Sequence, residues 1–124
     1  MKDPAIRIVL LPKDTNSHGN IFGGIILSYI DLSGIFTISR YSDQKIVTVA
    51  INEVIFKAPV HVGEIVSFYC SITKIGNTSI SVHVDVEVEK NFESILVTQA
   101  DLTYCSVGDN GKPVPLILKY QPSN

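Results

Sequence analysis

The sequence predicts an α+β fold in which one antiparallel sheet wraps around a single long helix. Residues 23–40 form a mostly apolar segment of helical length, and four segments with the two-residue alternation typical of β-strands follow it. Apolar residues lie nearly all round the helical segment, unlike those of a surface helix with one apolar stripe. Only the sheet is available to cover this helix, so we expect the sheet to curl around it.

The first elements are a short strand over residues 6–11 and a loop rich in turn formers, PKDTNSHGN. The helical segment that follows has Asp31 near its centre, a glycine at position 34 and several Ser and Thr. A membrane span needs about 20 largely apolar residues, so a helix buried in a water-soluble domain is expected instead.

Four strands complete the predicted order β-α-β-β-β-β. They cover residues 46–57, 65–75, 78–90 and 95–107. The first slips in phase near Asn52 and Glu53, which indicates a β-bulge. Gly76 and Asn77 are typical of a two-residue hairpin, and short turns between consecutive strands favour an antiparallel meander. An all-β barrel has no place for the helix, and a ferredoxin-like sandwich needs a second one.

Length and charge exclude several classes of function. With 124 residues the chain suffices for one hydrophobic core, so we expect a single domain, 1–124. The formal net charge of −2, without blocks of like charge, indicates neither nucleic-acid binding nor a polybasic membrane patch. The first residues lack the pattern of a signal peptide, and a cytoplasmic protein is expected. Cys70 and Cys105 are predicted to be reduced core residues.

Asp31 is the only acid in GGIILSYIDLSG, residues 23–34, and is a candidate catalytic group. No residue three or four positions away on the helix carries a positive charge. Burial without a partner makes a carboxylate a competent base. A solvent-facing aspartate, or one bonded to a backbone amide, is the alternative, and the pattern alone does not decide between them.

Gly23 and Gly24 open the helix although each glycine costs about 1 kcal/mol relative to alanine. Without Cβ atoms, the free N–H groups of the first turn can be approached by a ligand oxygen, and they form a candidate oxyanion hole. Close packing of the helix start against a strand is the alternative. Asn16 could orient a water or a carbonyl, but spacing alone does not separate it from its polar neighbours, which are expected to be turn residues.

No metal site is expected. His18, His61 and His83 lie in two loops and on the polar face of a strand, without the spacing of metal ligands. The sequence also lacks a GxSxG elbow, a Walker loop and a dinucleotide-binding fingerprint, so Ser/His/Asp catalysis has no support.

Four segments carry a family resemblance that extends over almost the whole chain. They are DTNSHGNIFGGIILSYIDLSG (14–34), VTVAINEVIFKAPVHVGEIV (47–66), KIGNTSISVHVDVEV (74–88) and DNGKPVPL (109–116). Together they resemble the short bacterial acyl-CoA thioesterases of the hotdog superfamily, in the YciA-type branch related to animal cytosolic acyl-CoA hydrolases. The resemblance implies the hotdog fold, a helix wrapped by an antiparallel sheet.

The resemblance also implies hydrolysis of an acyl-CoA thioester to a free acid and CoA, with no cofactor besides the CoA of substrate and product. Asp31 matches the family's catalytic carboxylate, acting as general base or as nucleophile, and Asn16 matches the asparagine that works with it. Gly24 matches the position whose amide polarises the thioester carbonyl. By similarity Asp31 and Asn16 meet across a protomer interface, which requires at least a homodimer, and the family commonly assembles dimers into hexamers as a trimer of dimers.

Substrate and CoA contacts are expected at further positions in the matching segments: Gly23, Lys57, Lys74, Thr78 and Ser79. The chain departs from the family pattern at Ile25, where relatives often have Trp, and at Asn52, where they have an acid, so its acyl preference stays open. A non-catalytic acyl-CoA-binding module on the same fold is the alternative function, but it would be expected to have lost the aspartate or the asparagine. A hotdog dehydratase needs a helix histidine, which this sequence lacks.

Overall fold

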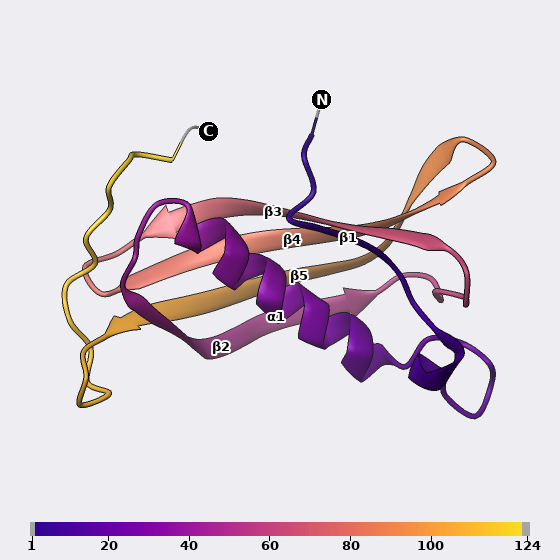
Figure 1. Ribbon diagram of the computed structural model, residues 1–124, viewed down its shortest axis with the longest axis horizontal. Helices are drawn as coiled ribbons and strands as arrows, with labels where there is room; N and C mark the ends of the chain where they lie inside the picture. Colours follow the sequence, from indigo (N-terminus) through magenta and orange to yellow (C-terminus); the bar gives the residue numbers. More distant parts are fainter. Residues whose placement is uncertain (1, 123–124) are drawn as a thin grey trace.

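The computed structural model describes residues 2–122, in which one helix lies across one face of a five-stranded sheet (Figure 1). The elements are β1 (Ile6–Val9), a 3₁₀ turn (Pro12–Asp14), α1 (Gly23–Ser39), β2 (Lys45–Phe56), β3 (Ile65–Ile75), β4 (Ser79–Lys90) and β5 (Glu93–Val107). The predicted α+β class and element order are confirmed. The outermost residues of the predicted domain, 1 and 123–124, lie outside the described part.

The sheet has the order β1-β3-β4-β5-β2, with every pair antiparallel. The predicted meander is therefore confirmed for β3, β4 and β5 but wrong for β2, which pairs with β5 instead of β3. The physical reason is the connection: residues 57–64, between β2 and β3, are too many for a tight hairpin, whereas short turns join β3 to β4 and β4 to β5. The predicted bulge is confirmed by a register shift between Ile51 and Glu53.

One face of α1 packs into the hydrophobic core. Its buried residues are Ile26, Ile30, Ser33, Gly34 and Ile38. They pack on the inner face of the sheet, where alternate side chains of β4 from Ile80 to Val88 are buried. Cys105 is buried and Cys70 half-buried, and both are free thiols. Within residues 2–122, no helix has the length and apolar character needed to cross a membrane.

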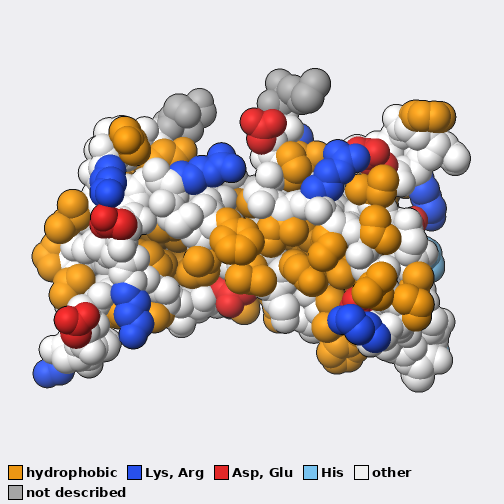
Figure 2. All heavy atoms as spheres, in the orientation of Figure 1, with side chains coloured by type: hydrophobic (Ala, Val, Ile, Leu, Met, Phe, Trp, Pro, Cys, Tyr) orange, Lys and Arg blue, Asp and Glu red, His pale blue; other side chains and the backbone are white. Residues whose placement is uncertain are grey.

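The sheet curls over one face of α1, as predicted, but the other face of the helix is not covered in the single chain. Leu32 is 43% exposed and Phe36 is 47% exposed. Figure 2 shows apolar side chains gathered along this face of the molecule. The edge strand β2 adds further exposed apolar side chains, among them Val49 and Ile51. The sheet covers only one side of the helix. Because apolar residues lie nearly all round α1, the side facing away from the sheet is an exposed apolar surface that a further partner could bury.

Tyr104 of β5 sets how closely α1 approaches the sheet. Its side chain is fully buried, and its hydroxyl donates a 2.8 Å hydrogen bond to the backbone carbonyl of Asp31. The ring lies against Gly34, where a Cβ atom would overlap both the hydroxyl and the ring carbons. The glycine in the middle of the helix is therefore explained by close approach of an aromatic ring.

Gly34→Ala is expected to destabilise the protein by about 1–3 kcal/mol, because the new methyl group overpacks a core that cannot yield at a buried tyrosine. Chemical denaturation of the two proteins measures the difference. Ser39→Ala, an exposed substitution at the end of the same helix, is the control and should change stability little. An unchanged unfolding midpoint for Gly34→Ala would show that the helix can shift away from Tyr104.

Candidate active site

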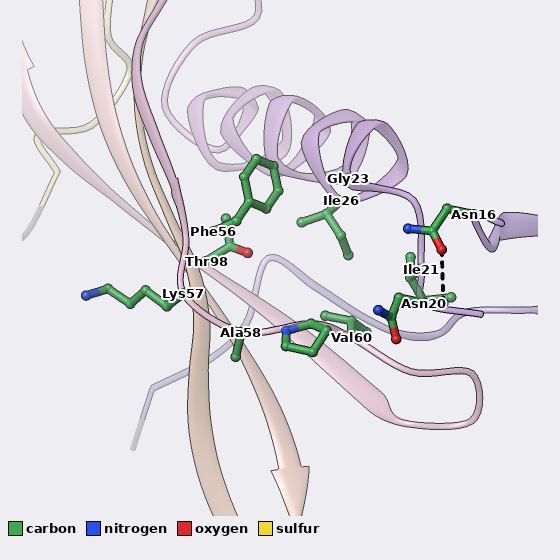
Figure 3. Close-up of a pocket in the computed structure, with 11 residues that line it drawn as sticks. Asn16, Asn20, Ile21, Gly23, Ile26, Phe56, Lys57, Ala58, Val60 and Thr98 are labelled. Carbon is green, nitrogen blue, oxygen red and sulfur yellow. Dashed lines mark hydrogen bonds between the residues drawn. The ribbon is translucent and has the colours of Figure 1, made fainter. Parts of the chain in front are cut away.

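A pocket of about 330 Å³ lies at the N-terminal end of α1 (Figure 3). Four parts of the chain line it: the loop before the helix, the first turn of the helix, the segment from Phe56 to Val60 and residue Thr98 of β5. The loop is tied to the neighbouring segment, since the N–H of Ile21 donates to the carbonyl of Val60 at 2.8 Å. The pocket is therefore built by residues far apart in the sequence.

Asn16 lines this pocket and organises its loop. Its side-chain oxygen accepts hydrogen bonds from the N–H groups of His18 (2.9 Å) and Asn20 (3.2 Å). Its own N–H donates to the carbonyl of Asn20 at 2.7 Å. Asn16 is thus a turn residue, as the sequence allowed. Of its side-chain amide, only the oxygen takes part in the hydrogen bonds of the turn. The side-chain NH₂ makes no hydrogen bond to any residue between 2 and 122 and is left as a donor.

Gly23 and Gly24 present free amides at the helix start. No described residue accepts a hydrogen bond from either N–H, and the N-cap residue, Phe22, provides no side-chain cap. Packing explains neither glycine: a Cβ at Gly23 would make ordinary contact with Phe56 at 3.5 Å, and one at Gly24 would meet only the exposed, movable ring of Phe22. The alternative of close packing is therefore not supported. Gly23 lines the pocket, whereas Gly24 lies on the exposed side of the helix start.

Asp31 lies about two helical turns further on and is half-buried, not buried. It also has a partner, contrary to the expectation from its helical neighbours, because the hydroxyl of Thr48 donates to its carboxylate at 2.6 Å. Thr48 and Tyr104 are directly opposite each other on β2 and β5. One cross-strand pair therefore holds Asp31 by its side chain and by its backbone.

The two hydroxyls that hold Asp31 were not predicted from the sequence. Burial, and then the nearby Asp31, raise the pKa of Tyr104 far above its usual range, so its hydroxyl stays a neutral donor. Thr48 breaks the apolar alternation of β2 with a hydroxyl on the phase that faces the helix. That polar residue at an inward position was the available signal, but identifying its partner needed the register of β2 on β5.

The single chain does not bring the predicted site residues together. Asp31 does not line the pocket that contains Asn16. Thr78 and Ser79 lie at the turn between β3 and β4, at the opposite end of the sheet from the start of α1 (Figure 1). Lys74 lies near the same turn, and the side chain of Lys57 extends away from the pocket that its residue lines (Figure 3).

His83 lies on the polar face of β4, as predicted, between two carboxylates. Its Nδ1 is 2.8 Å from Asp101 of β5, and its Nε2 is 2.8 Å from Asp85. Partial burial lowers the pKa of His83, but the hydrogen bonds to the two carboxylates outweigh it and raise the pKa above 6.5. The cluster is on the outer face of the sheet and joins β4 to β5.

Comparisons with known proteins agree with one another. The family model of the Thioesterase superfamily matches residues 18–94. The acyl-CoA thioester hydrolase YciA of Salmonella typhimurium is 35% identical over 116 residues, covering 90% of this chain and 87% of the relative. The crystal structure of a hexameric hotdog fold thioesterase of Campylobacter jejuni is 44% identical, has a TM-score of 0.82 and covers 91% of this chain and 89% of that chain.

Solved structures of an acyl-CoA hydrolase from Staphylococcus aureus are also similar. An asparagine-to-alanine mutant in complex with coenzyme A is 25% identical, with a TM-score of 0.85, and covers 96% of this chain and 72% of that chain. An aspartate-to-alanine mutant of the S. aureus enzyme is similar at the same identity, with a TM-score of 0.83.

The raised pKa of His83 predicts a pH-dependent contribution to stability. Because its folded pKa lies above the unfolded value of 6.5, its contribution is fully present below about pH 6.5 and is lost as the pH rises through the folded pKa. The pKa of Asp85 is lowered by hydrogen bonds from Gln99 and His83 despite its burial, so its contribution is lost as the pH falls through that value. Melting temperatures of wild type and His83→Gln should therefore differ most at mildly acidic pH and converge above it.

His18→Gln, in an exposed loop, is the matched control and should show no such convergence. A stability difference between wild type and His83→Gln that stays constant from mildly acidic to alkaline pH would contradict the role given to the two carboxylates.

Proposed function

Because the chain belongs to the Thioesterase superfamily, as a hotdog-fold acyl-CoA thioester hydrolase, we propose that Asp31 of one chain and Asn16 and Gly24 of another form its active site. The family resemblance and the hotdog fold predicted from the sequence are confirmed by these similarities. The observation that carries the proposal is that α1 combines two free amides at its start with an aspartate held once by its carboxylate and once by its backbone carbonyl.

In this site the thioester carbonyl lies against the Gly24 amide. Negative charge develops on the carbonyl oxygen as the carbonyl carbon is attacked, and an N–H at the positive end of the helix dipole stabilises it. The free NH₂ of Asn16 orients the attacking water or the carbonyl. Thr48 donates to one carboxylate oxygen of Asp31, which fixes the group while the second oxygen stays available.

Asp31 acts by one of two routes. As a general base it takes a proton from water, which attacks the carbonyl carbon, and the thiolate of CoA leaves. As a nucleophile it attacks the carbonyl carbon itself and the thiolate of CoA leaves, and water then hydrolyses the resulting mixed anhydride. Both routes end in a free acid and CoA, and incorporation of labelled oxygen into the carboxylate of Asp31 in a single turnover distinguishes them.

The spacing of the two polar residues supports these roles. The asparagine and the aspartate replaced in the S. aureus acyl-CoA hydrolase mutants are separated by the same number of positions as Asn16 and Asp31. One of those mutants was solved in complex with coenzyme A.

A second chain is proposed to complete the site, because the first chain exposes apolar side chains and a free strand edge through which two copies can pair. Leu32 and Phe36 of α1 and Val49 and Ile51 of the edge strand β2 are exposed apolar side chains. Two copies related by a twofold axis would bury these residues and pair the free edge of β2. The minimum active unit is then a homodimer. The C. jejuni relative is hexameric, and we propose that this chain also forms a hexamer, arranged as a trimer of dimers.

The CoA contacts are proposed to come from more than one chain. Lys74, Thr78 and Ser79 lie at or near the β3–β4 turn, at the opposite end of the sheet from the start of their own α1. In a dimer they are available to a CoA held at the other chain's helix start, and Lys57 lies on the wall of that pocket. The two free cysteines fit a reducing compartment, and we propose the cytoplasm.

Release of CoA thiol from acyl-CoAs of graded chain length tests the proposed activity. Asp31→Asn should lower kcat by about 10²–10⁴-fold, which is the usual contribution of a positioned general base, and the variant should still fold. Asp109→Asn, an exposed aspartate outside the sheet, is the matched control and should keep wild-type rates. Wild-type turnover by a folded Asp31→Asn protein would exclude Asp31 from the chemistry.

Mixed oligomers test the shared site. Asp31→Ala and Asn16→Ala chains are each expected to be inactive alone, but a mixed dimer has one site in which both residues are intact. Co-refolding equal amounts should restore about a quarter of the wild-type activity, because half of the dimers are mixed and each has one working site. If the mixture stays as inactive as its components although mass spectrometry detects mixed dimers, both residues act within one chain.

A further inference from the structure

Thr98 of β5 has a buried hydroxyl that the fold leaves unsatisfied. The residue is 1% exposed, and its Oγ1 has no hydrogen-bond partner in the described part of the chain. It lies opposite Phe56 on β2 and Val86 on β4, both apolar. The two other hydroxyls of this face described above, those of Thr48 and Tyr104, both bond to Asp31. Thr98 is therefore the exception among them.

Packing does not account for this hydroxyl. Valine has almost the same shape as threonine, and the neighbouring strand uses valine at the paired position, Val86. Because a buried hydroxyl without a partner lowers stability, valine would serve the fold better. A threonine is favoured at this position only if the hydroxyl finds a partner in some state of the protein.

Thr98 lines the pocket at the start of α1, and its hydroxyl lies beneath the pocket wall, closed to solvent in the single chain. Figure 3 shows the side-chain oxygen of Thr98 pointing into the space bounded by Ile26 and Val60. At about 330 Å³ the pocket is large enough for a short chain, since small-molecule sites begin near ~300 Å³. Two of its other polar lining residues, Asn16 and Asn20, belong to the loop on the far side, and the side chain of the third, Lys57, extends away from the pocket. An apolar chain with one hydrogen-bonding group fits this distribution of polar and apolar wall.

We propose that Thr98 is a specificity-determining residue whose hydroxyl hydrogen-bonds a polar group carried on the chain beside the thioester. This inference rests on the proposed function, because it takes the occupant of the pocket to be an acyl-CoA. Two parts of such a substrate carry a suitable group: the pantetheine arm, through its amides, and an acyl group with a hydroxyl or oxo oxygen near the carbonyl. Both present an oxygen or N–H to the Thr98 hydroxyl, which can donate and accept.

Thr98→Val and Thr98→Ser separate the hydroxyl from the shape of the side chain. The substrates are butyryl-CoA, 3-hydroxybutyryl-CoA, S-butyryl-N-acetylcysteamine, which keeps only the first amide of the arm, and S-propyl thiobutyrate, which has none. We expect Thr98→Val to lower kcat/KM at least about 10-fold for substrates that carry the recognised group, because an unpaired polar group is then left in the site, and Thr98→Ser to stay within about threefold of wild type.

The pattern of losses identifies the group. If only 3-hydroxybutyryl-CoA is affected, the hydroxyl recognises an oxygenated acyl chain. If both CoA esters and the N-acetylcysteamine ester are affected but S-propyl thiobutyrate is not, it recognises the arm. Thr98→Val rates within about twofold of wild type on all four substrates, together with a higher melting temperature, would overturn the proposal and leave Thr98 a structural residue.

Binding separates this proposal from the proposed hydrolysis. Titration calorimetry of wild type and Thr98→Val with CoA and with a non-hydrolysable thioether analogue of 3-hydroxybutyryl-CoA measures affinity without cleavage. A weaker Kd for Thr98→Val in a protein that releases no thiol would retain the subsite and reject the reaction. If wild type and Thr98→Val have equal Kd values for each of the two ligands, the subsite is rejected even if hydrolysis is observed.

Discussion

The hydroxyls of Thr48 and Tyr104, facing each other on β2 and β5, hold Asp31 by its carboxylate and its backbone carbonyl. This clamp depends on β2 pairing with β5, because a simple meander would put Thr48 beside β3 instead. It also depends on Gly34, since any side chain there would push the helix away from the tyrosine ring. The strand order, the glycine in the helix and the position of the acid are therefore parts of one constraint.

What the chain leaves unsatisfied is as informative as what it satisfies. Within residues 2–122, the amides of Gly23 and Gly24 and the hydroxyl of Thr98 have no hydrogen-bond partner at one end of the helix, and apolar side chains including Leu32 and Phe36 are exposed along it. The buried hydroxyl without a partner lowers the stability of the single chain, and exposed apolar side chains are typical of a surface that another molecule covers. A ligand at the helix start and a second chain on the apolar surface would satisfy all of them.

Local pattern predicted the helix over 23–40, observed as Gly23–Ser39, its central acid and the β3–β5 hairpins, because apolar periodicity and turn residues specify them within a short stretch. The place of β2 was predicted wrongly, because pairing between distant segments leaves no local signal. Thr48 and Thr98 were missed for the same reason: a threonine at an inward strand position gains meaning only from what lies opposite. The site residues that came from family resemblance, Asn16 above all, needed knowledge beyond this sequence's own periodicity.

The most direct measurement is a crystal structure with a thioether analogue of an acyl-CoA, which binds as the substrate does but lacks the scissile thioester. We expect the analogue between two chains, within about 3 Å of the Gly24 amide of one and with the Asp31 carboxylate of the other within one water of the reacting carbon position. An analogue enclosed by a single chain, or bound with no Asp31 carboxylate near that position, would contradict a site shared between chains.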